Sequence, residues 1–452
     1  MLHDYRPRGM TRLRILFVTP YVPSPLRVRP YHLIRQLSQR GHRVTVAGLC
    51  TPEEEQAVAA LRAECERVET LPLSWSRALW NCIRQRPAGM PLQALYTHSA
   101  AMQRLLQDEL RAAAVDNGRQ APYDLVHIEH LRAARLGLVA HNLPCVYDAV
   151  DCISRLLEHA ATRAASRMVR CAARFDLNRT RRFEAWLLGQ FDCTLTASEA
   201  DKQALVELAA PPGQRMRGIP AMHSGAAGVP AIAVLPNGVD LAYFQPSDAP
   251  REPATLVFVG RMSYHANVTA ILWFVHDVLP LIWAQRPDTQ LLIVGSHPVR
   301  AVRQLGRRYG PRVAVTGYVP DTRPFLARAT VSVSPLLYAV GMQNKILEAM
   351  AMGTPVVATP PGCAALHVQP GTDLLVAEGA AHFAAQVVRL LDDAALRRGL
   401  AEEGRRYVQD DHDWHAVGTQ LEDIYCEAAA RFRARTTVAG PPLASRSGDG
   451  TC

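Results

Sequence analysis

The sequence predicts an α/β fold made of two doubly wound domains that face each other. Short apolar runs of strand length alternate with helical patterns in both halves of the chain, which indicates mostly parallel sheets. A stretch rich in Pro, Gly and Met, residues 211–230, interrupts this alternation and separates the halves. Glycine or a charged residue also follows four apolar runs of the second half, where an open α/β sheet binds its ligands.

Six apolar runs in the first half have the length of buried strands, and a helical pattern at 31–40 follows the first of them. These runs are 13–18, 43–48, 68–73, 125–128, 145–148 and 193–196. The second half contains five more, at 256–259, 291–294, 313–316, 331–334 and 355–358. We therefore expect two sheets of similar size, one in each half.

The same patterns predict the domain limits. We expect a first Rossmann-like domain over residues 1–230 and a second over 231–411. A helix over 412–435 is expected to return to the first domain. A tail at 436–452, rich in Gly, Pro and Ser, is expected to be disordered.

Composition restricts the classes of protein to be considered. The chain has 452 residues and a formal net charge of +9, which favours an anionic substrate or membrane face. No groove-reading or base-stacking motif is present, so we expect no nucleic-acid partner. The 10 cysteines form no Cys-x-x-Cys pair, which predicts a reducing compartment and no zinc site. We find no apolar segment suited to a signal peptide or a membrane span, and expect a cytoplasmic protein.

Lysine is rare in this chain, and one lysine lies in its most patterned segment. Only two of the 50 Lys and Arg residues are lysine, Lys202 and Lys345. Residues 341–359 are predicted to form a loop, a helix and a strand. The amino end of such a helix, at the carboxyl end of a parallel strand, binds phosphate through free N–H groups and the helix dipole. Lys345 suits a phosphate and Glu348 suits sugar hydroxyls, although an ordinary helix with a solvated lysine has the same pattern.

Three other strand ends of the second half carry glycine or charge. Gly260 and Arg261 follow one predicted strand, Gly295 follows the next, and 317–319 follow the third. Ligands in open α/β sheets bind beyond such ends, so we predict a site between the domains. The alternative for Arg261 is a salt bridge to the neighbouring domain.

Five segments in order make the chain resemble the retaining glycosyltransferases of family 4, which have the GT-B fold. The segments are 236–240, 260–261, 293–295, 315–319 and 345–353. Three further segments, 126–132, 264–267 and 343–345, look like bacterial exopolysaccharide sugar transferases of the subgroup associated with PEP-CTERM and exosortase systems.

This resemblance implies transfer of a sugar from a nucleotide-diphosphate donor, with retention at the anomeric carbon and no obligatory metal or cofactor. The donor is expected mainly on the second domain, and a lipid-linked or polysaccharide acceptor on the first. Glu348 matches the glutamate that binds ribose hydroxyls, and Arg261 matches the residue that contacts the diphosphate. Gly317, Tyr318 and Val319 are expected near the base. The other donor-binding residues are expected to be Gly260, Gly341, Asn344 and Lys345.

The sequence departs from the family pattern at two positions of the second domain. Val340 stands where a second glutamate is usual, so the role of that carboxylate is not transferred. The usual lysine shortly after Arg261 is also missing. We hypothesise that Lys345 supplies the second positive charge and helps catalysis together with Arg261.

The first domain is expected to supply the remaining groups. His127, Glu129 and His130 occupy the place of a family His-x-His pattern, and either Glu129 or His130 is expected to reach the reacting sugar, with His127 on the acceptor side. The alternative is a buried His127 and a Glu129 paired with an arginine. Arg27 and Arg29 are expected at the mouth of the site, facing an anionic acceptor, or else in a solvated loop.

A basic stretch over residues 155–182 carries eight arginines with interleaved apolar residues. On a helix this pattern suits an anionic lipid surface, and a solvated face with a buried stripe is the alternative.

Three other classes of protein compete with the transferase. A nicotinamide oxidoreductase needs a Gly-x-Gly-x-x-Gly that the first strand lacks. A non-catalytic nucleotide-sugar-binding module and a GT-B sugar-nucleotide epimerase remain alternatives.

Overall fold

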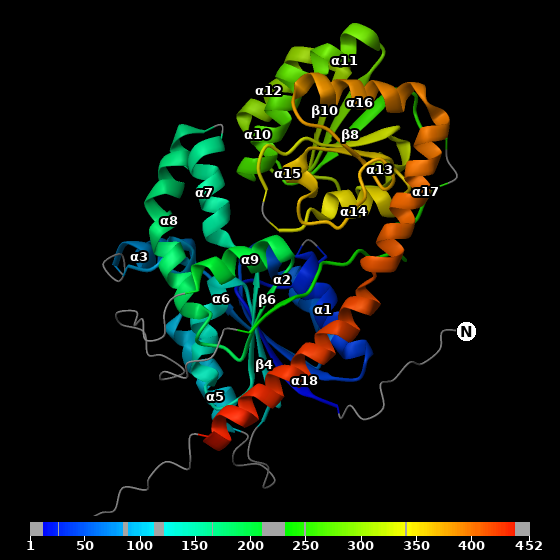
Figure 1. The fold of residues 1–452 in the computed structure, drawn as a ribbon. Coiled ribbons are helices and arrows are strands. Elements are labelled where there is room, and N and C mark those ends of the chain that lie inside the picture. Colours follow the sequence, from blue (N-terminus) through cyan, green and yellow to red (C-terminus); the bar gives the residue numbers. More distant parts are fainter. Residues whose placement is uncertain are drawn as a thin grey trace, which may run out of the picture.

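The computed structural model describes most of the chain as two α/β lobes (Figure 1). The described residues are 12–25, 27–84, 89–112, 122–164, 166–209, 231–247, 250–339 and 341–438. The predicted 211–230 interruption, Val340 and most of the predicted 436–452 tail lie outside them. Each lobe has one parallel sheet, and separate apolar clusters cover its two faces.

The first sheet has seven parallel strands in the order β3-β2-β1-β4-β5-β6-β7. Its strands are β1 Arg14–Thr19, β2 Arg43–Cys50, β3 Arg67–Pro72, β4 Leu125–Glu129, β5 Cys145–Val150, β6 Cys193–Thr196 and β7 Ile232–Val234. The helices of this lobe are α1 Val28–Gln39, η1 Pro52–Glu54, α2 Glu55–Glu64, α3 Trp75–Arg84, α4 Leu92–Tyr96, α5 Ala100–Ala112, α6 His130–Gly137, η3 Leu138–Ala140, α7 Ile153–Arg163, α8 Arg167–Leu187 and α9 Glu199–Leu208.

The second sheet has six parallel strands in the order β10-β9-β8-β11-β12-β13. Its strands are β8 Thr255–Val259, β9 Gln290–Val294, β10 Val313–Gly317, β11 Val331–Ser334, β12 Val356–Ala358 and β13 Leu375–Val376. The helices are α10 His265–Trp273, η4 Phe274–Val278, α11 Leu279–Gln285, α12 Arg300–Tyr309, η5 Gly310–Arg312, α13 Arg323–Arg328, α14 Asn344–Ala351, α15 Pro360–Cys363, α16 Ala380–Asp392 and α17 Ala394–Asp411.

All eleven strands expected from apolar runs form within a residue or two of the expected limits, because each run is buried on both faces of a parallel sheet. Strands β7 and β13, which have only three and two residues, were not expected from the sequence. Since β7 still belongs to the first sheet, the change of domain falls a few residues beyond the predicted limit at 230.

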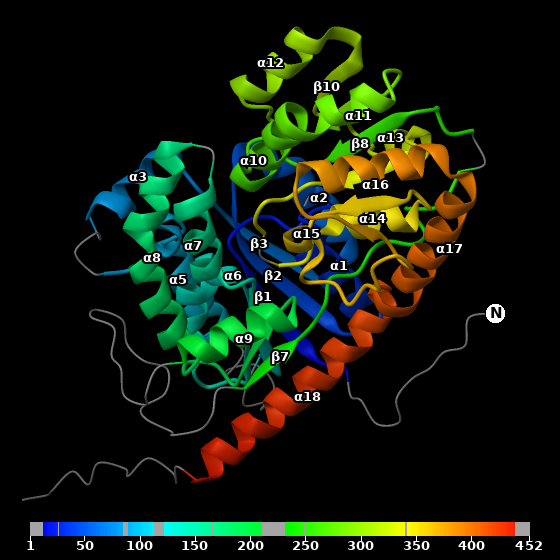
Figure 2. The ribbon, with the colours of Figure 1, turned by 45° about the horizontal axis from the view of Figure 1, so that its top comes forward.

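The last helix, α18 Trp414–Val438, crosses back onto the first lobe, as expected (Figures 1 and 2). Its apolar face joins the core beneath β1, and Leu421 and Tyr425 are fully buried there. The Tyr425 hydroxyl lies 2.9 Å from Nδ1 of His127 in β4. Residues 436–438, expected in the tail, belong to this helix.

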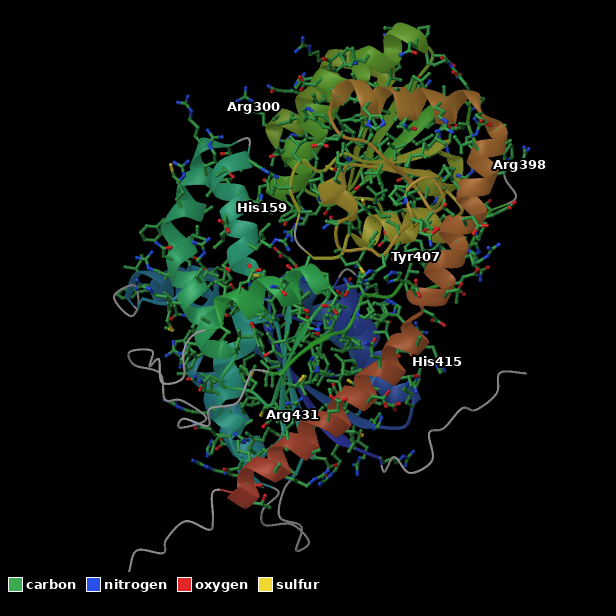
Figure 3. All side chains as sticks on the ribbon, viewed as in Figure 1. His159, Arg300, Arg398, Tyr407, His415 and Arg431 are labelled. Carbon is green, nitrogen blue, oxygen red and sulfur yellow. The ribbon has the colours of Figure 1, made fainter. Side chains whose placement is uncertain are left out.

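The two crossings between the lobes lie against each other. The amide of Val239, in the first crossing, donates to the carbonyl of His412 in the second at 2.8 Å. The His412 ring meets the carbonyl of Asn237 at 2.7 Å. A Cβ at Gly238 would come within 2.7 Å of the Trp414 ring, so glycine permits this close approach. His415, labelled at the start of α18 in Figure 3, anchors the second crossing because Arg40, the residue after α1, donates to its carbonyl at 2.7 Å.

One continuous helix, His265–Gln285, is long and apolar enough by composition to cross a membrane. This corrects the expectation that no segment passes that test. More than half of the helix is buried inside the second lobe, where Phe274, Val278 and Ile282 belong to its main apolar cluster. Its apolar character is therefore explained by the core of this lobe.

Candidate active site between the two domains

The carboxyl ends of the central strands of both sheets meet between the lobes. In each sheet the chain order reverses between two neighbouring strands, β1 and β4 in the first and β8 and β11 in the second. Such switch points are where open α/β sheets hold ligands. We call the residues at these four strand ends, with the amino end of α14, the interdomain site.

Lys345 is partly buried at the start of α14 and held by a residue of α10. Its Nζ donates to Oδ1 of Asn267 at 2.6 Å and lies 5.2 Å from the centre of the Phe258 ring. Nδ2 of Asn267 donates to the carbonyl of Arg261 at 3.0 Å. One buried amide therefore connects the lysine on α14 to the strand end that carries Arg261. The side chain is therefore partly buried and hydrogen-bonded, in contrast to the alternative of a fully solvated lysine.

Burial shifts the pKa of both charged residues on α14 toward neutrality. It lowers the pKa of Lys345 to about 8, although nearby Glu348 acts in the opposite direction. It raises the pKa of Glu348 to about 7, with Lys345 again opposing the shift. Two groups that titrate close to neutral pH at a helix start are typical of a functional site.

Arg261 follows β8 and is exposed. Its Nε donates to the Ser263 hydroxyl at 3.1 Å, and it forms no ion pair among the residues that the structure describes. The salt-bridge alternative is therefore not seen there. The pKa of Arg132, in the first lobe, is lowered mainly by burial. The charges of Arg27 and then Arg261 lower it further, so Arg261 lies near Arg132. Guanidinium groups from both lobes thus approach one place.

Glycines permit close packing at the strand ends of the second lobe. A Cβ at Gly260 would lie 2.8 Å from Nδ2 of Asn267, so a side chain there would displace the amide that holds Lys345. Gly295 has φ +147°, and a Cβ there would overlap the carbonyl of Gly260. Gly317 has φ +74° with open space beside it, and the Tyr318 side chain after it is 66% exposed. Val319 is partly buried.

Gly341, in the loop before α14, is a point of close contact between the lobes. Its amide donates to Oδ2 of Asp201 in α9 at 3.1 Å. Its φ is +63°, and a Cβ would overlap the carboxylate of Asp151, which follows β5. Burial and the neighbouring Asp201 raise the pKa of Asp151 to about 7. Neither aspartate was singled out by the sequence analysis, because their proximity arises only when the two lobes meet.

A chain of hydrogen bonds connects the core of the first lobe to the start of α14. Asp148 in β5 binds Arg29, with 2.7 Å between Oδ2 and Nε. Nη1 of Arg29 donates to Oδ1 of Asn237 at 2.8 Å, and Nδ2 of Asn237 donates to Oδ1 of Asn344 at 3.0 Å. No side chain caps the amino end of α14, and the Ile346 amide donates to the Gln343 carbonyl at 2.9 Å. Within the described chain, the amides of Asn344 and Lys345 are the ones left for a ligand.

The expectation that Arg29 faces the acceptor is therefore wrong. The side chain is only 5% exposed and its guanidinium is used by Asp148, Asn237 and a backbone carbonyl. Its neighbour Arg27 does lie on the surface side, where it stacks on the Tyr21 ring at 4.3 Å and approaches Glu54 at 4.0 Å.

Glu129 ends β4 and is almost completely buried. Its Oε1 accepts from the Tyr21 hydroxyl at 2.9 Å, while Oε2 has no partner. Burial, assisted by nearby Asp148, raises the pKa of Glu129 to about 8. The carboxyl group therefore holds a proton at neutral pH and is bound by a tyrosine, not by the arginine of the alternative.

The two histidines of the same motif have different places. His127 is fully buried between Phe17 and Tyr425, and burial lowers its pKa to about 4, so it belongs to the core and is not on the acceptor side. His130 has φ +67°, unusual for a residue with a side chain, and begins α6 at the interdomain site. Its Nδ1 accepts from the Arg132 amide at 3.2 Å, and burial lowers its pKa to about 3.

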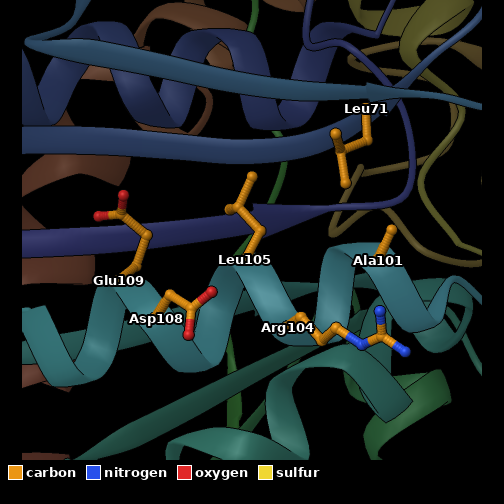
Figure 4. A pocket seen from close by; sticks show the side chains of 6 residues that line it. All are labelled: Leu71, Ala101, Arg104, Leu105, Asp108 and Glu109. Carbon is orange, nitrogen blue, oxygen red and sulfur yellow. The ribbon is translucent and has the colours of Figure 1, made fainter.

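A surface hollow occurs away from this site, between β3 and α5 (Figure 4). It is lined by Leu71, Ala101, Arg104, Leu105, Asp108 and Glu109. None of these residues belongs to the strand ends described above. Among the described residues, no group of three or more His, Cys, Asp or Glu side chains is arranged to hold a metal ion.

Two family models match the chain, one in each lobe. Residues 26–221 match a glycosyl transferase 4-like domain, and residues 253–393 match glycosyl transferases group 1. Two facing Rossmann-like lobes with parallel sheets form the GT-B fold. Each lobe thus resembles a glycosyltransferase domain, and the fold is that of the GT-B glycosyltransferases.

Similar proteins include several mannosyltransferases. A GDP-mannose-dependent monoacylated alpha-(1-6)-phosphatidylinositol monomannoside mannosyltransferase of Corynebacterium glutamicum is 30% identical over 43% of this chain and 56% of its own. A phosphatidyl-myo-inositol mannosyltransferase of Mycolicibacterium smegmatis is 30% identical over 42% and 50%. The chain thus spans about half the length of these curated relatives. An MMP alpha-(1->4)-mannosyltransferase of Mycolicibacterium hassiacum is 26% identical over 89% and 94%.

Solved structures share the fold over nearly the whole chain. A sucrose-phosphate synthase from Thermosynechococcus elongatus superposes with a TM-score of 0.62 at 19% identity, covering 95% of this chain and 100% of that one. HepE of Anabaena in complex with UDP gives a TM-score of 0.61 at 17% identity, covering 91% and 99%. At such identities the likeness concerns the fold alone.

Proposed function

We propose that this protein transfers a sugar from a nucleotide-diphosphate donor to a lipid-linked or polysaccharide acceptor, with retention of anomeric configuration. The observation that carries the proposal is the uncapped start of α14 at the interdomain site, with Lys345 and Glu348 beside it. Guanidinium groups of Arg132 and Arg261 approach the same place from the two lobes.

The diphosphate of the donor binds the free amides of α14, with Lys345 and Arg261 as its cationic partners. A diphosphate carries its charge on oxygens that accept such charge-assisted hydrogen bonds. Glu348 accepts hydrogen bonds from the ribose hydroxyls. The base lies against the backbone of Gly317 to Val319, where Gly317 leaves open space.

Transfer then depends on stabilising the departing diphosphate. Fixed cations in a site from which water is excluded favour the charge that develops as the sugar–phosphate bond breaks. Glu129, protonated at neutral pH, and the uncharged ring of His130 face the sugar from the first lobe. Hydrogen bonds from these groups orient the sugar for attack by the acceptor hydroxyl on the face that the diphosphate leaves.

Two observations support the proposed biological setting. The three segments 126–132, 264–267 and 343–345 support a role in bacterial exopolysaccharide synthesis of the PEP-CTERM-associated kind. The relatives named as phosphatidyl-myo-inositol mannosyltransferases support an acceptor that is part of a lipid. In this setting the enzyme works on the cytoplasmic face of a membrane.

A thermal-shift screen of uridine, guanosine and adenosine diphosphate sugars tests the donor. One nucleotide series should raise the melting temperature, because a ligand that binds only the folded protein stabilises it. Product analysis by NMR on the responding donor should then show transfer with retained configuration. A donor converted to another sugar nucleotide, or bound without transfer or hydrolysis, would contradict the proposal in favour of an epimerase or a binding module.

A further inference from the structure

Helix α3 is attached to the first lobe by one face. On that face Ala78 is buried, and Nδ2 of Asn81 donates to the carbonyl of His98 at 2.7 Å. The thiol of Cys82 lies 3.8 Å from the carbonyl of Leu92 at the start of α4. Successive residues of a helix are turned by about 100°, so these three side chains mark one side.

The opposite side of α3 is apolar and exposed. Leu79, Trp80 and Ile83 are 56%, 66% and 64% exposed. Surface helices normally place polar side chains on the face turned to water. Three large apolar side chains together on one outer face are therefore unusual and indicate a contact surface.

Helix α8 lies beside α3, in both views of the fold (Figures 1 and 2). Asp176 of α8 accepts from the amide of Leu92, at the start of α4, at 3.1 Å. Asp176 also lies close enough to Cys82 of α3 to raise the pKa of this thiol, after the larger effect of burial. The basic stretch predicted as one helix is in fact a hairpin, with α7 packed along α8. Only α8 of this pair adjoins α3 in the two views.

The outer face of α8 carries positive charge and further apolar side chains. Within the described chain, the exposed arginines of α8 that form no ion pair or hydrogen bond are Arg167, Arg174 and Arg182. Met168 and Phe175 on the same helix are 80% and 41% exposed. The only acids of α8, Asp176 and Glu184, are buried and accept from backbone amides, so they do not neutralise this face.

We propose that the outer faces of α3 and α8 together dock the protein on an anionic lipid surface. The apolar side chains of α3 enter the boundary between headgroups and acyl chains, where a tryptophan such as Trp80 is favoured. The arginines of α8 pair with lipid phosphates above it. This combination of bare cations and apolar side chains complements an anionic bilayer, whereas a protein partner would need acidic groups spaced to match each arginine. The proposal rests on the proposed lipid-linked acceptor, which such docking would bring to the first lobe.

Flotation of the full-length protein with vesicles tests the proposal without any turnover. At low salt the protein should float with vesicles containing phosphatidylglycerol and not with pure phosphatidylcholine. The variant Leu79→Ser/Trp80→Ser/Ile83→Ser should bind at least about a hundredfold more weakly, because each side chain loses its apolar burial. In the variant Arg167→Gln/Arg174→Gln/Arg182→Gln, the affinity for the anionic vesicles should fall by about fivefold for each arginine removed. All these residues are exposed, so unchanged melting temperatures are expected.

Matched controls lie in the second lobe. Leu281→Ser removes a similarly exposed leucine from α11, and Arg300→Gln/Arg303→Gln/Arg307→Gln removes three exposed arginines from α12, where Figure 3 labels Arg300. Both should float like the wild type. Equal binding by all variants, or no flotation at low salt, would overturn the proposal. So would a wild-type dimer that the α3 variant makes monomeric, since the face would then join two copies of the chain.

The readout is independent of the transferase proposal. Donor binding and transfer to a water-soluble acceptor should be unchanged in the α3 and α8 variants, since none of these residues belongs to the interdomain site. If the protein floats but no donor binds, only the proposed function fails. If a donor binds but the protein never floats, only the docking surface fails.

Discussion

At the scale of single residues, the interdomain site depends on a lysine whose charge is costly to keep. Lys345 is partly buried, donates a hydrogen bond to Asn267, and has a pKa lowered to about 8 by desolvation. An incoming diphosphate would supply the negative charge that the protein lacks there. Lys345 is thus held ready for an anion, and Asn267 fixes its direction.

Replacing Lys345 by alanine should weaken donor binding by about ten- to a hundredfold, since a hydrogen bond to a charged group contributes about 1.5–3 kcal/mol. Turnover should fall by at least as much, because the departing diphosphate gains charge. Calorimetry with the nucleoside diphosphate and initial rates measure both effects. Lys202→Ala is a natural control, since the other lysine of the chain lies on α9 in a pair with Glu199. An unchanged rate in Lys345→Ala would reject the assigned role.

Donor affinity should also depend on pH. Because the pKa of free Lys345 is about 8, the ammonium loses its proton as pH rises through that value. A bound diphosphate favours the charged form, so binding should take up a proton near pH 8 and weaken above it. Calorimetry in buffers of different ionisation enthalpy measures this uptake. The proton uptake should vanish in Lys345→Ala, and its persistence there would assign it to another group.

At the scale of elements, the loop between β11 and α14 determines how closely the lobes approach. Gly341 has φ +63° and no room for a side chain, since Asp151 occupies the place of a Cβ. Its amide is held by Asp201. The loop therefore positions the start of α14 through contacts made by the other lobe.

The variant Gly341→Ala should separate the lobes or displace the start of α14, and donor binding should fall well beyond the effect on stability. Gly310→Ala is the matched control, because Gly310 has a similar φ of +58° and open space around it. In both variants the free energy of unfolding should fall by about 1–2 kcal/mol, because alanine is strained in the left-handed backbone conformation. Thermal unfolding and donor titration of the two proteins separate these effects. Equal donor binding would show that the contact with Asp151 has no part in the site.

At the scale of the whole molecule, two aspartates from the first lobe meet the second lobe. Asp151 and Asp201 both lie against Gly341. Asp151 is also close to Tyr264 of the second lobe, and its charge raises the pKa of Tyr264 after the larger effect of burial. The pKa of Asp151 is raised to about 7 by burial first and then by Asp201, with Asp148 adding and Arg29 opposing. The closed arrangement thus favours a protonated Asp151.

This raised pKa predicts that closure of the lobes weakens as pH rises. The stabilisation from a protonated Asp151 is complete below the ordinary pKa of 3.8 and is lost as pH rises through about 7. The radius of gyration from small-angle scattering should therefore increase across that range. Asp151→Asn should flatten the dependence, whereas Asp288→Asn, at an exposed aspartate, should leave it unchanged. A wild-type radius that is constant with pH would contradict the expectation.

Much of this architecture could be predicted because its causes are local in the chain. Buried parallel strands appear as apolar runs, so even β6 and β11 were expected at their observed limits. The helix carrying Lys345 and Glu348 follows from helix-forming residues that end at Gly353 and Pro355. The short strands β7 and β13 have too few residues to leave such a pattern.

The residues that were placed wrongly or not singled out depend instead on contacts between distant parts of the chain. Arg29 was expected on the surface, but Asp148, far away in the sequence, pairs with it in the core. Asn267 follows Arg261 in the segment from which the usual lysine is missing, and its bond to Lys345 depends on how α10 packs against α14. His127 became a core residue because α18 returns over it.

The sequence by itself determined two doubly wound domains, the returning helix, and the lysine and glutamate at the start of a helix beyond a strand. Apolar periodicity and helix signals act over a few residues and are readable without the fold. Only the tertiary structure decided which charges are buried, which are paired, and which meet across the two lobes. The pKa and availability of a side chain depend on solvent exclusion and on neighbours brought from distant parts of the chain, and both arise only when the lobes pack together.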